Sequence, residues 1–176
     1  MKRLGLLRHA KSDWDDMSLR DFDRGLNDRG RKGAALMGDH IRDYGAKWDL
    51  VLASPAERVK RTLEASGLDV PVRYDERIYL GEARALLAIL QHLDEDDPRA
   101  VLLMGHNPGL QELALDLVPA EREDGQFDAL MQKYPTAAFA AFDLDIENWN
   151  EMEPGCGTLV HFARPRDLDP ELGPER

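Results

Sequence analysis

The sequence predicts an α/β fold with a mainly parallel sheet. Strand-like apolar runs alternate with helix-like segments through residue 117, and this alternation is typical of βαβ units. Two later apolar runs, residues 139–144 and 158–163, have no clear helix between them. The order of the segments therefore predicts a set of parallel strands first and a hairpin-like addition near the end of the chain.

The individual elements follow from short apolar runs, helical periodicity and turn residues. The expected strands are residues 2–8, 48–53, 70–74, 101–104, 139–144 and 158–163. The expected helices are residues 28–44, 55–66, 83–93 and 110–117, the first capped by Asn27 or Asp28. Four connecting segments are expected to be irregular: an acidic loop at 11–27, a polar link at 94–99, a polar stretch at 121–133 and a turn region at 145–153.

Length and composition indicate one globular domain. The chain has 176 residues, of which 43% are hydrophobic, enough for a full core. We expect this domain to span residues 1–165 and a mobile polar tail to follow at 166–176, where Pro and Gly are frequent. A net charge of −11, from 34 acidic and 23 basic residues, argues against nucleic acid or an anionic membrane as a partner.

The sequence also indicates a cellular compartment. One cysteine, Cys156, rules out an internal disulfide and suits a reducing environment. The chain has no apolar run of about 18 residues, which a membrane span requires, and no signal-peptide pattern at its start. We therefore expect a cytoplasmic protein.

Polar side chains follow three of the expected strands. Arg8 and His9 end the first, Arg58 lies one helical turn after the second, and His106 directly follows the strand at 101–104. In an open α/β sheet, ligands bind in the crevice beyond the carboxyl ends of the strands. We expect these four residues to form one site.

Their chemistry favours phosphate. Arginine offers a planar fork of donors to two phosphate oxygens, and neutral histidine is a nucleophile near pH 7. None of the five histidines has a His-x-x-His or His-Glu-x-x-His spacing. We expect no metal and no cofactor, because the arginines supply the positive charge that a metal ion would bring.

Three motifs in this order resemble the histidine phosphatase superfamily, to which phosphoglycerate mutases belong. They are Leu-Arg-His-Ala-Lys-Ser from Leu7 to Ser12, Ser-Pro-x-x-Arg-x-x-x-Thr from Ser54 to Thr62, and Gly-His-Asn-Pro from Gly105 to Pro108. The usual superfamily motif is Arg-His-Gly, and Ala10 replaces the glycine, as in the small SixA-type phosphohistidine phosphatases. The resemblance covers residues 1–165 and implies a three-layer α/β/α sandwich, phosphoglycerate mutase-like, with a mixed sheet of about six strands.

The resemblance also implies roles for the four residues. His9 would attack phosphorus and form a phosphohistidine that water hydrolyses, releasing inorganic phosphate. Arg8 and Arg58 would hold the non-bridging oxygens, and His106 would hold a third oxygen. The substrate would be a phosphorylated protein or a small phosphorylated molecule, with phosphohistidine in a protein favoured.

Three further residues are candidates for substrate binding. Arg24 matches an arginine of the family's Arg-Pro-Leu-Thr-x-x-Gly stretch, although it could instead be a surface arginine paired with neighbouring aspartates. Asn107 follows His106 in the third motif, and Thr136 lies in a Pro-Thr-x-Ala sequence that related phosphatases have near the pocket. All three are expected near the phosphoryl group.

The general acid and the substrate remain open at this point. Glu76 and Glu82 both fall where related enzymes place a glutamate that protonates the leaving group, and phosphohistidine as substrate needs such an acid less. A small-molecule phosphomonoesterase is one alternative function, and a non-catalytic phosphate-binding module is another. The second would be expected to lack the nucleophile or a clamp arginine, and neither is missing.

Overall fold

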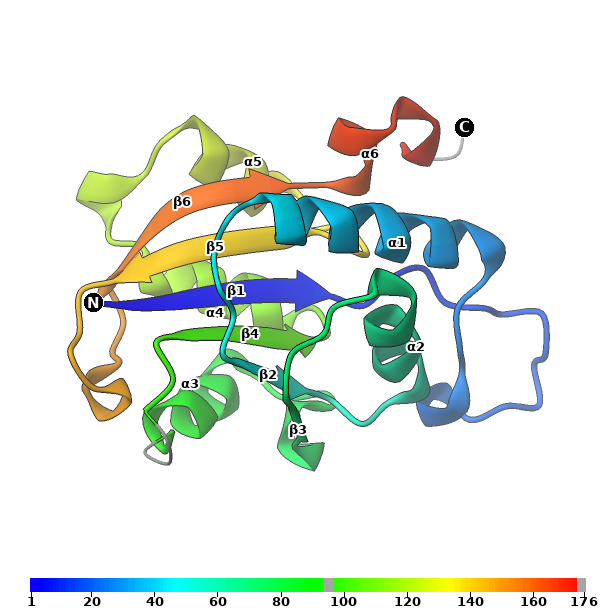
Figure 1. Cartoon of the computed structure of the whole chain (residues 1–176), viewed down its shortest axis with the longest axis horizontal. Helices are drawn as coiled ribbons and strands as arrows, with labels where there is room; N and C mark the ends of the chain where they lie inside the picture. Colours follow the sequence, from blue (N-terminus) through cyan, green and yellow to red (C-terminus); the bar gives the residue numbers. More distant parts are fainter. Residues whose placement is uncertain (94–96, 174–176) are drawn as a thin grey trace.

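A computed structural model describes residues 1–93 and 97–173 and contains one six-stranded mixed sheet. Its strands are β1 (Lys2–Arg8), β2 (Leu50–Ala53), β3 (Val72–Tyr74), β4 (Ala100–Gly105), β5 (Phe139–Leu144) and β6 (Gly157–Ala163). They lie in the order β3-β2-β4-β1-β5-β6 (Figure 1). The first four strands pair in parallel, and β5 pairs antiparallel with both β1 and β6. The mainly parallel sheet with a late hairpin-like addition is therefore confirmed.

Helices cover both faces of the sheet. The α-helices are α1 (Asp28–Asp43), α2 (Glu57–Ser66), α3 (Ala83–Gln91), α4 (Gly109–Leu117), α5 (Gly125–Gln132) and α6 (Pro165–Leu168). The described residues also include five short 3₁₀ helices: η1 (Asp21–Asp23), η2 (Glu76–Ile78), η3 (Ala120–Arg122), η4 (Trp149–Glu151) and η5 (Pro170–Leu172). α1 and α2 lie in front of the sheet in Figure 1, and α3 and α4 lie behind it. The three-layer α/β/α arrangement is thus present.

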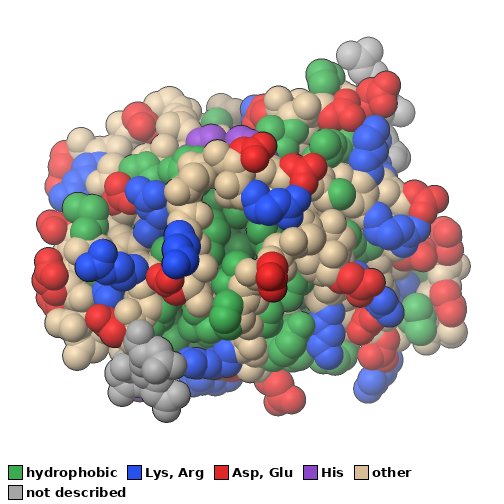
Figure 2. All heavy atoms as spheres, viewed as in Figure 1, with side chains coloured by type: hydrophobic (Ala, Val, Ile, Leu, Met, Phe, Trp, Pro, Cys, Tyr) green, Lys and Arg blue, Asp and Glu red, His purple; other side chains and the backbone are tan. Residues whose placement is uncertain are grey.

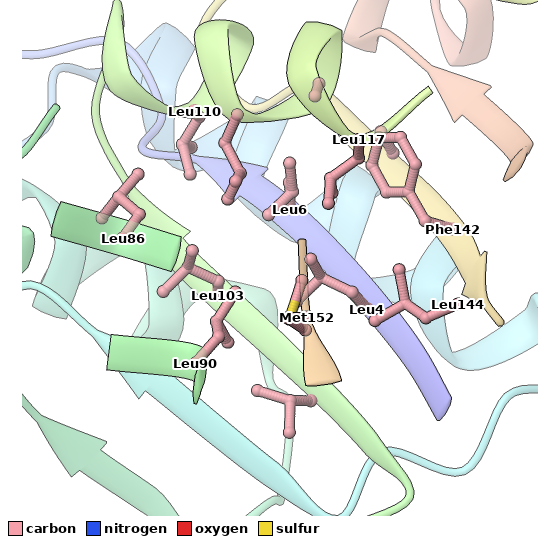
Figure 3. Close-up of a cluster of buried hydrophobic side chains, with 14 of the residues drawn as sticks. Leu4, Leu6, Leu86, Leu90, Leu103, Leu110, Leu117, Phe142, Leu144 and Met152 are labelled. Carbon is pink, nitrogen blue, oxygen red and sulfur yellow. The ribbon is translucent and has the colours of Figure 1, made fainter. Parts of the chain in front are cut away.

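Alternate residues of the buried strands pack into two separate cores, because successive side chains of a strand point to opposite faces. Leu4 and Leu6 of β1 belong to the larger core, which includes side chains from α3, α4 and α5 (Figure 3). Leu7 lies in the other core with Met37 and Ile41 of α1. Complete burial of each such side chain stabilises the fold by about 1.5–3 kcal/mol.

The stretch at 121–133, expected to be irregular, contains a helix, so that expectation is wrong. The Asp124 side chain accepts a hydrogen bond from Phe127 N at 2.9 Å and caps the start of α5. Phe127 and Leu130 lie three positions apart and are both buried in the larger core. The helix was not predicted because its first turn is polar and only one narrow face is apolar.

The C-terminal segment is also more ordered than the sequence suggests. Residues 165–172, expected to belong mostly to a mobile tail, form α6 and η5 instead. Lys32 of α1 holds this segment through Asp169 Oδ2 at 3.1 Å and Glu171 Oε2 at 3.5 Å. Both prolines of the segment stand at a helix start, where the missing N–H costs nothing. Residues 174–176 of the expected tail lie outside the described residues.

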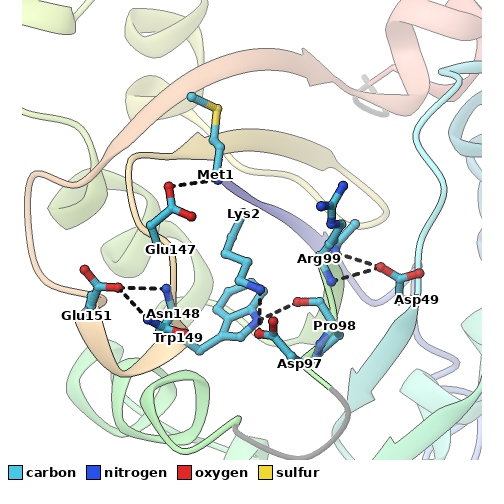
Figure 4. A network of polar contacts seen from close by, with 11 residues as sticks. Met1, Lys2, Asp49, Asp97, Pro98, Arg99, Glu147, Asn148, Trp149 and Glu151 are labelled. Carbon is cyan, nitrogen blue, oxygen red and sulfur yellow. Dashed lines mark hydrogen bonds and ion pairs between the residues drawn. The ribbon is translucent and has the colours of Figure 1, made fainter.

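Polar contacts close the edge of the sheet at which β1 and β4 begin (Figure 4). Buried Lys2 forms an ion pair with Asp97 at 2.6 Å, and Trp149 Nε1 donates to Pro98 O at 2.6 Å. Asp49 Oδ2 accepts from the backbone N–H groups of Arg99 and Ala100. The opposite edge, where the parallel strands end, carries the polar residues of the three motifs.

Within the described part of the chain, no helix is long and apolar enough to cross a membrane.

The close contact of α1 with α2 yields a stability prediction. A Cβ atom on Gly38 would overlap the backbone of Ser66, whereas one on Gly33 of the same helix would meet Ala137 Cβ at 3.9 Å, an ordinary contact. We expect Gly38→Ala to lower the free energy of unfolding by about 1–3 kcal/mol. Gly33→Ala should leave it unchanged or raise it by about 0.4–1 kcal/mol. Urea denaturation of both variants tests this, and equal stability would contradict it.

Candidate active site

The site lies where β1, β4 and β2 end side by side. The register pairs Arg8 with Gly105 and Ala53 with Met104. The ladder continues one residue further, because His9 N donates to Gly105 O and Ser54 N donates to Met104 O, both at 3.1 Å. This brings the His9 and His106 rings together, with their centroids 5.3 Å apart.

His9 is held as a neutral imidazole with one tautomer. Its Nδ1 lies 2.7 Å from the carbonyl oxygen of Ala10, which can only accept, so Nδ1 carries the proton and Nε2 carries the lone pair. The pKa of His9 is lowered to about 3, mainly by burial and also by the charges of Arg8, His106 and Arg58, while the hydrogen bond to the Ala10 carbonyl opposes this shift. His9 is therefore a neutral imidazole at neutral pH, with a lone pair on Nε2.

His106 is buried beside it and is also neutral. Its Nε2 lies 2.8 Å from Ser54 Oγ, and its ring meets the Tyr79 ring edge-on at 5.4 Å. Burial lowers the pKa of His106 to about 4, with Arg58 as the next cause. The hydrogen bond explains the serine of the second motif, which positions the imidazole from the end of β2.

The two arginines lie beside the histidines. Arg8 Nη1 donates to Tyr134 O at 3.0 Å, and Arg8 Nε is buried with no partner among the described residues. Arg58 is 7% exposed. The charges of Arg8 and Arg58 lower the pKa values of both histidines, so the four groups lie near enough to interact electrostatically. Two cations and two neutral imidazoles around one point can bind a dianion.

A carboxylate that sequence reasoning did not single out also reaches the site. Asp21 belongs to the acidic loop, and its Oδ2 lies 3.0 Å from Arg58 Nη2 and accepts from Tyr79 Oη at 2.6 Å. The Tyr79 hydrogen bond, followed by Arg58, holds the pKa of Asp21 below its usual value. Asp21 is one of five aspartates in its loop, so no local pattern distinguishes it.

Two other residues position the catalytic groups. Thr62 Oγ1 accepts from Ala10 N at 2.9 Å and donates to Arg58 O at 2.7 Å, so the last residue of the second motif ties α2 to the end of β1. Tyr134 O accepts from Arg8 Nη1, and its hydroxyl donates to Leu6 O at 2.5 Å. Tyr134 was not a candidate, because its partners come from a distant part of the chain.

The three predicted substrate-binding residues occupy different places. Arg24 is buried, so its interpretation as a surface arginine is wrong; its Nη atoms donate to Asp16 O and Leu19 O within the acidic loop. Asn107 Nδ2 donates to Tyr134 O at 3.0 Å, the acceptor that Arg8 also uses. Thr136 lines a cavity beside Arg8.

The two glutamates considered as general acids, Glu76 and Glu82, are both exposed. Neither carboxylate has a hydrogen bond or ion pair with a residue of the site in the described part of the chain, whereas the Asp21 carboxylate has both. Over the same residues, no group of three or more His, Cys, Asp or Glu side chains could hold a metal ion.

Comparisons with known proteins agree with this geometry. The family model of the histidine phosphatase superfamily, branch 1, matches residues 4–84. An uncharacterised protein of Mycobacterium tuberculosis is 34% identical over 161 residues, which cover 91% of this chain and all of that protein. The phosphohistidine phosphatase SixA of Escherichia coli is 27% identical and is matched over 93% of this chain and 94% of its own.

Solved structures show the same fold. A protein from Nakamurella multipartitia, provisionally identified as a phosphohistidine phosphatase SixA, superposes with a TM-score of 0.82 at 27% identity, covering 93% of this chain and 96% of that chain. A second, from Agrobacterium tumefaciens and identified in the same provisional way, gives a TM-score of 0.76 at 27% identity, covering 93% and 98%. With the matched family model and the three ordered motifs, these likenesses show that the chain belongs to the histidine phosphatase superfamily, in its SixA-type branch.

Proposed function

We propose that this phosphatase removes the phosphoryl group from phosphohistidine in a protein, through a covalent intermediate on His9, and releases inorganic phosphate. The names of its SixA-type relatives and the order of its three motifs support this substrate. The acidic net charge of the chain argues for a protein partner rather than nucleic acid or an anionic membrane, and we expect the enzyme to act in the cytoplasm.

The observation that carries the mechanism is the state of His9. Its proton is fixed on Nδ1 by the Ala10 carbonyl, so the lone pair is on Nε2, and Arg8 and Arg58 lie near enough to lower the pKa of the ring. A nucleophile is activated when it is unprotonated at the working pH. Burial keeps the His9 ring neutral, so no separate general base is needed to remove a proton from Nε2. A phosphoryl group can be transferred to a histidine only when the attacking nitrogen carries a lone pair.

The reaction has two steps, transfer of the phosphoryl group to His9 and hydrolysis of phospho-His9. The substrate imidazole first takes a proton from water on its free ring nitrogen. His9 Nε2 then forms a bond to phosphorus as the bond from phosphorus to the substrate nitrogen breaks, and the substrate imidazole leaves as a neutral ring. Water then attacks the phosphorus of phospho-His9, the N–P bond breaks back to neutral His9, and inorganic phosphate departs. Arg8, Arg58 and His106 hold the non-bridging oxygens in both steps, because stabilising their charge is the main task in phosphoryl transfer.

A phosphomonoesterase activity is the second candidate, and Asp21 favours it. An alkoxide leaves only if an acid protonates it, and the Asp21 carboxylate is 3.0 Å from Arg58 Nη2. A bound phosphoryl group would compete with Asp21 for Arg58. Loss of that ion pair raises the pKa of the carboxyl, which could then carry the proton that an ester leaving group needs.

The covalent intermediate can be trapped. Quenching at alkaline pH with labelled phosphohistidine peptide should leave label on the peptide containing Arg8 and His9, because an N–P bond is stable to alkali and labile to acid. His9→Ala should abolish both label and turnover. His106→Ala should lower turnover by about a hundred- to a thousandfold and still accumulate label. Label on His106, or near-native turnover by His9→Ala, would overturn the assignment.

Asp21→Asn separates the two candidate functions. If Asp21 protonates the leaving group, this variant should lose about 10²–10⁴-fold in kcat with an alkyl phosphate. With phosphohistidine peptide, whose leaving imidazole accepts its own proton, kcat should change less than about tenfold. Asp23→Asn in the same loop is the matched control and should leave both rates unchanged. Equal losses by Asp21→Asn on both substrates would contradict a role specific to the leaving group.

The buried histidines also make stability depend on pH. The pKa values of His9 and His106 are lowered to about 3 and 4 in the folded protein, so below their unfolded value of about 6.5 the unfolded chain binds more protons. Stability should therefore fall as the pH decreases from about 7 to about 5, by about 1–2 kcal/mol for each histidine.

Replacing His9 tests this directly. His9→Gln should flatten the pH dependence of the free energy of unfolding over that range, measured by urea denaturation. His92→Gln, which changes an exposed histidine, is the control and should keep the wild-type slope. An identical slope in His9→Gln would show that His9 is not buried as a neutral imidazole.

A further inference from the structure

A second cavity lies beside the candidate active site and has a volume of about 290 Å³. Four parts of the chain form its walls: the segment at the end of β1, the first turns of α1, the loop 133–137 and the C-terminal segment with α6 and η5. Arg8 lines this cavity, but His9, Arg58 and His106 do not. The cavity therefore adjoins the predicted phosphoryl site and shares only Arg8 with those four residues.

The lining of this cavity is strongly basic. Six of its residues carry a positive charge: Arg8, Lys11, Arg29, Lys133, Arg164 and Arg166. Among the described residues that line it, none is acidic, although the whole chain has 34 acidic and 23 basic residues. Elsewhere, the face shown in Figure 2 has acidic and basic side chains intermixed. The cavity is thus a local concentration of positive charge on an acidic protein.

Part of this charge has no counter-ion among the residues that the structure describes. Arg164 is paired with Asp167 at 2.9 Å, and the nearby acids Asp169 and Glu171 are engaged by Lys32 outside the lining. Lys133 and Arg166 have no ion pair with any described residue. Cations gathered around a concave surface focus a positive potential into it, and an anion is the ligand that such a potential selects.

The rest of the lining gives the cavity its shape. Ala10, Pro135, Ala137, Pro165 and Leu172 supply apolar surface, and the Thr136 hydroxyl supplies a neutral polar group. At Gly33 of α1, a Cβ atom would meet its nearest neighbours at 3.9 Å and 4.0 Å, so this wall of the cavity has room for a side chain. The wall at residues 164–167 is fixed by hydrogen bonds from Arg164 N and Nε to Asp167 Oδ2.

We propose that this cavity binds a small organic or inorganic anion with at least two phosphate or carboxylate groups. Its volume of about 290 Å³ is just below the range for small-molecule sites, about 300–1,000 Å³, and a half-open concavity of this size suits a small molecule better than a protein surface. Lys133 and Arg166 contact the charged groups. The ligand is either a second anionic group of a small substrate or a free polyanion, and the chemistry of binding is the same for both.

Calorimetric titration with inorganic pyrophosphate tests the site without requiring turnover. Wild-type protein should bind pyrophosphate at two sites, the phosphoryl site and this cavity. Arg58→Ala should lose one site and keep the other. Lys133→Ala with Arg166→Ala should weaken the remaining site by at least about tenfold, since a hydrogen bond to a charged group is lost at each position. Binding at this site should also weaken as salt is added.

Gly33→Leu is an independent variant that fills the cavity and removes no charge. It should abolish the same site, and Gly33→Ala should retain it. Gly33→Leu and the double variant Lys133→Ala/Arg166→Ala should both hydrolyse p-nitrophenyl phosphate at rates within about twofold of wild type, which would show that they are folded. If pyrophosphate binding is unchanged in Gly33→Leu and in Lys133→Ala/Arg166→Ala, or if Arg58→Ala abolishes all binding, the proposal is wrong.

Two further measurements identify the kind of ligand. If the anion is part of the substrate, Lys133→Ala/Arg166→Ala should raise KM for a small sugar bisphosphate and leave KM for p-nitrophenyl phosphate unchanged. If the anion is free, both KM values should stay unchanged while pyrophosphate binding is lost. Displacement of pyrophosphate by an equal concentration of an Asp- and Glu-rich peptide would instead assign the cavity to a protein segment and overturn the proposal of a small ligand.

Discussion

At the end of β1, the carbonyl groups of three successive residues each accept a hydrogen bond. Ala137 N donates to the carbonyl oxygens of Arg8 and His9, at 3.1 and 2.9 Å, and the His9 ring donates to Ala10 O at 2.7 Å. Ala10 N is held by Thr62 Oγ1. Because the backbone is fixed on both sides, the His9 ring has one orientation and one tautomer. The proposed chemistry depends on this constraint, since a ring in another orientation or in the other tautomer would not offer the Nε2 lone pair to phosphorus.

The charge balance of the site follows from burial around that backbone. Arg8 and Arg58 retain their charge in a region where His9 and His106 are neutral, because desolvation and the two guanidinium groups both disfavour further protonation. The described neighbours provide one carboxylate, that of Asp21, at 3.0 Å from Arg58. The site therefore has an excess of positive charge that a phosphoryl dianion would neutralise, on a protein whose net charge is −11.

The sequence predicted the sheet and the four central residues because both depend on local signals. A buried strand is an apolar run, and Arg8, His9 and His106 follow such runs directly. Tyr134 and Asp21 were missed because their roles come from contacts across 128 and 37 positions of the chain, with Leu6 and Arg58. The C-terminal helices were missed because Pro165 and Pro170 resemble helix breakers, although proline is favoured at the first helical position.

The acidic loop at residues 11–27 places one of its aspartates, Asp21, against Arg58 of the site. Buried Arg24 donates to the carbonyl oxygens of Asp16 and Leu19 and lies over the Trp14 ring at 4.1 Å, so a single guanidinium fixes the path of the loop. The loop then returns across α2, where Asp21 O and Oδ2 both accept from Arg58. In the absence of a phosphoryl group, Asp21 satisfies Arg58 and limits the repulsion between Arg58 and Arg8. Substrate would replace the carboxylate, while the backbone carbonyl of Asp21 would keep Arg58 in position. The same loop residue therefore balances the charge of Arg58 in the empty site and holds its guanidinium where a phosphoryl group would bind.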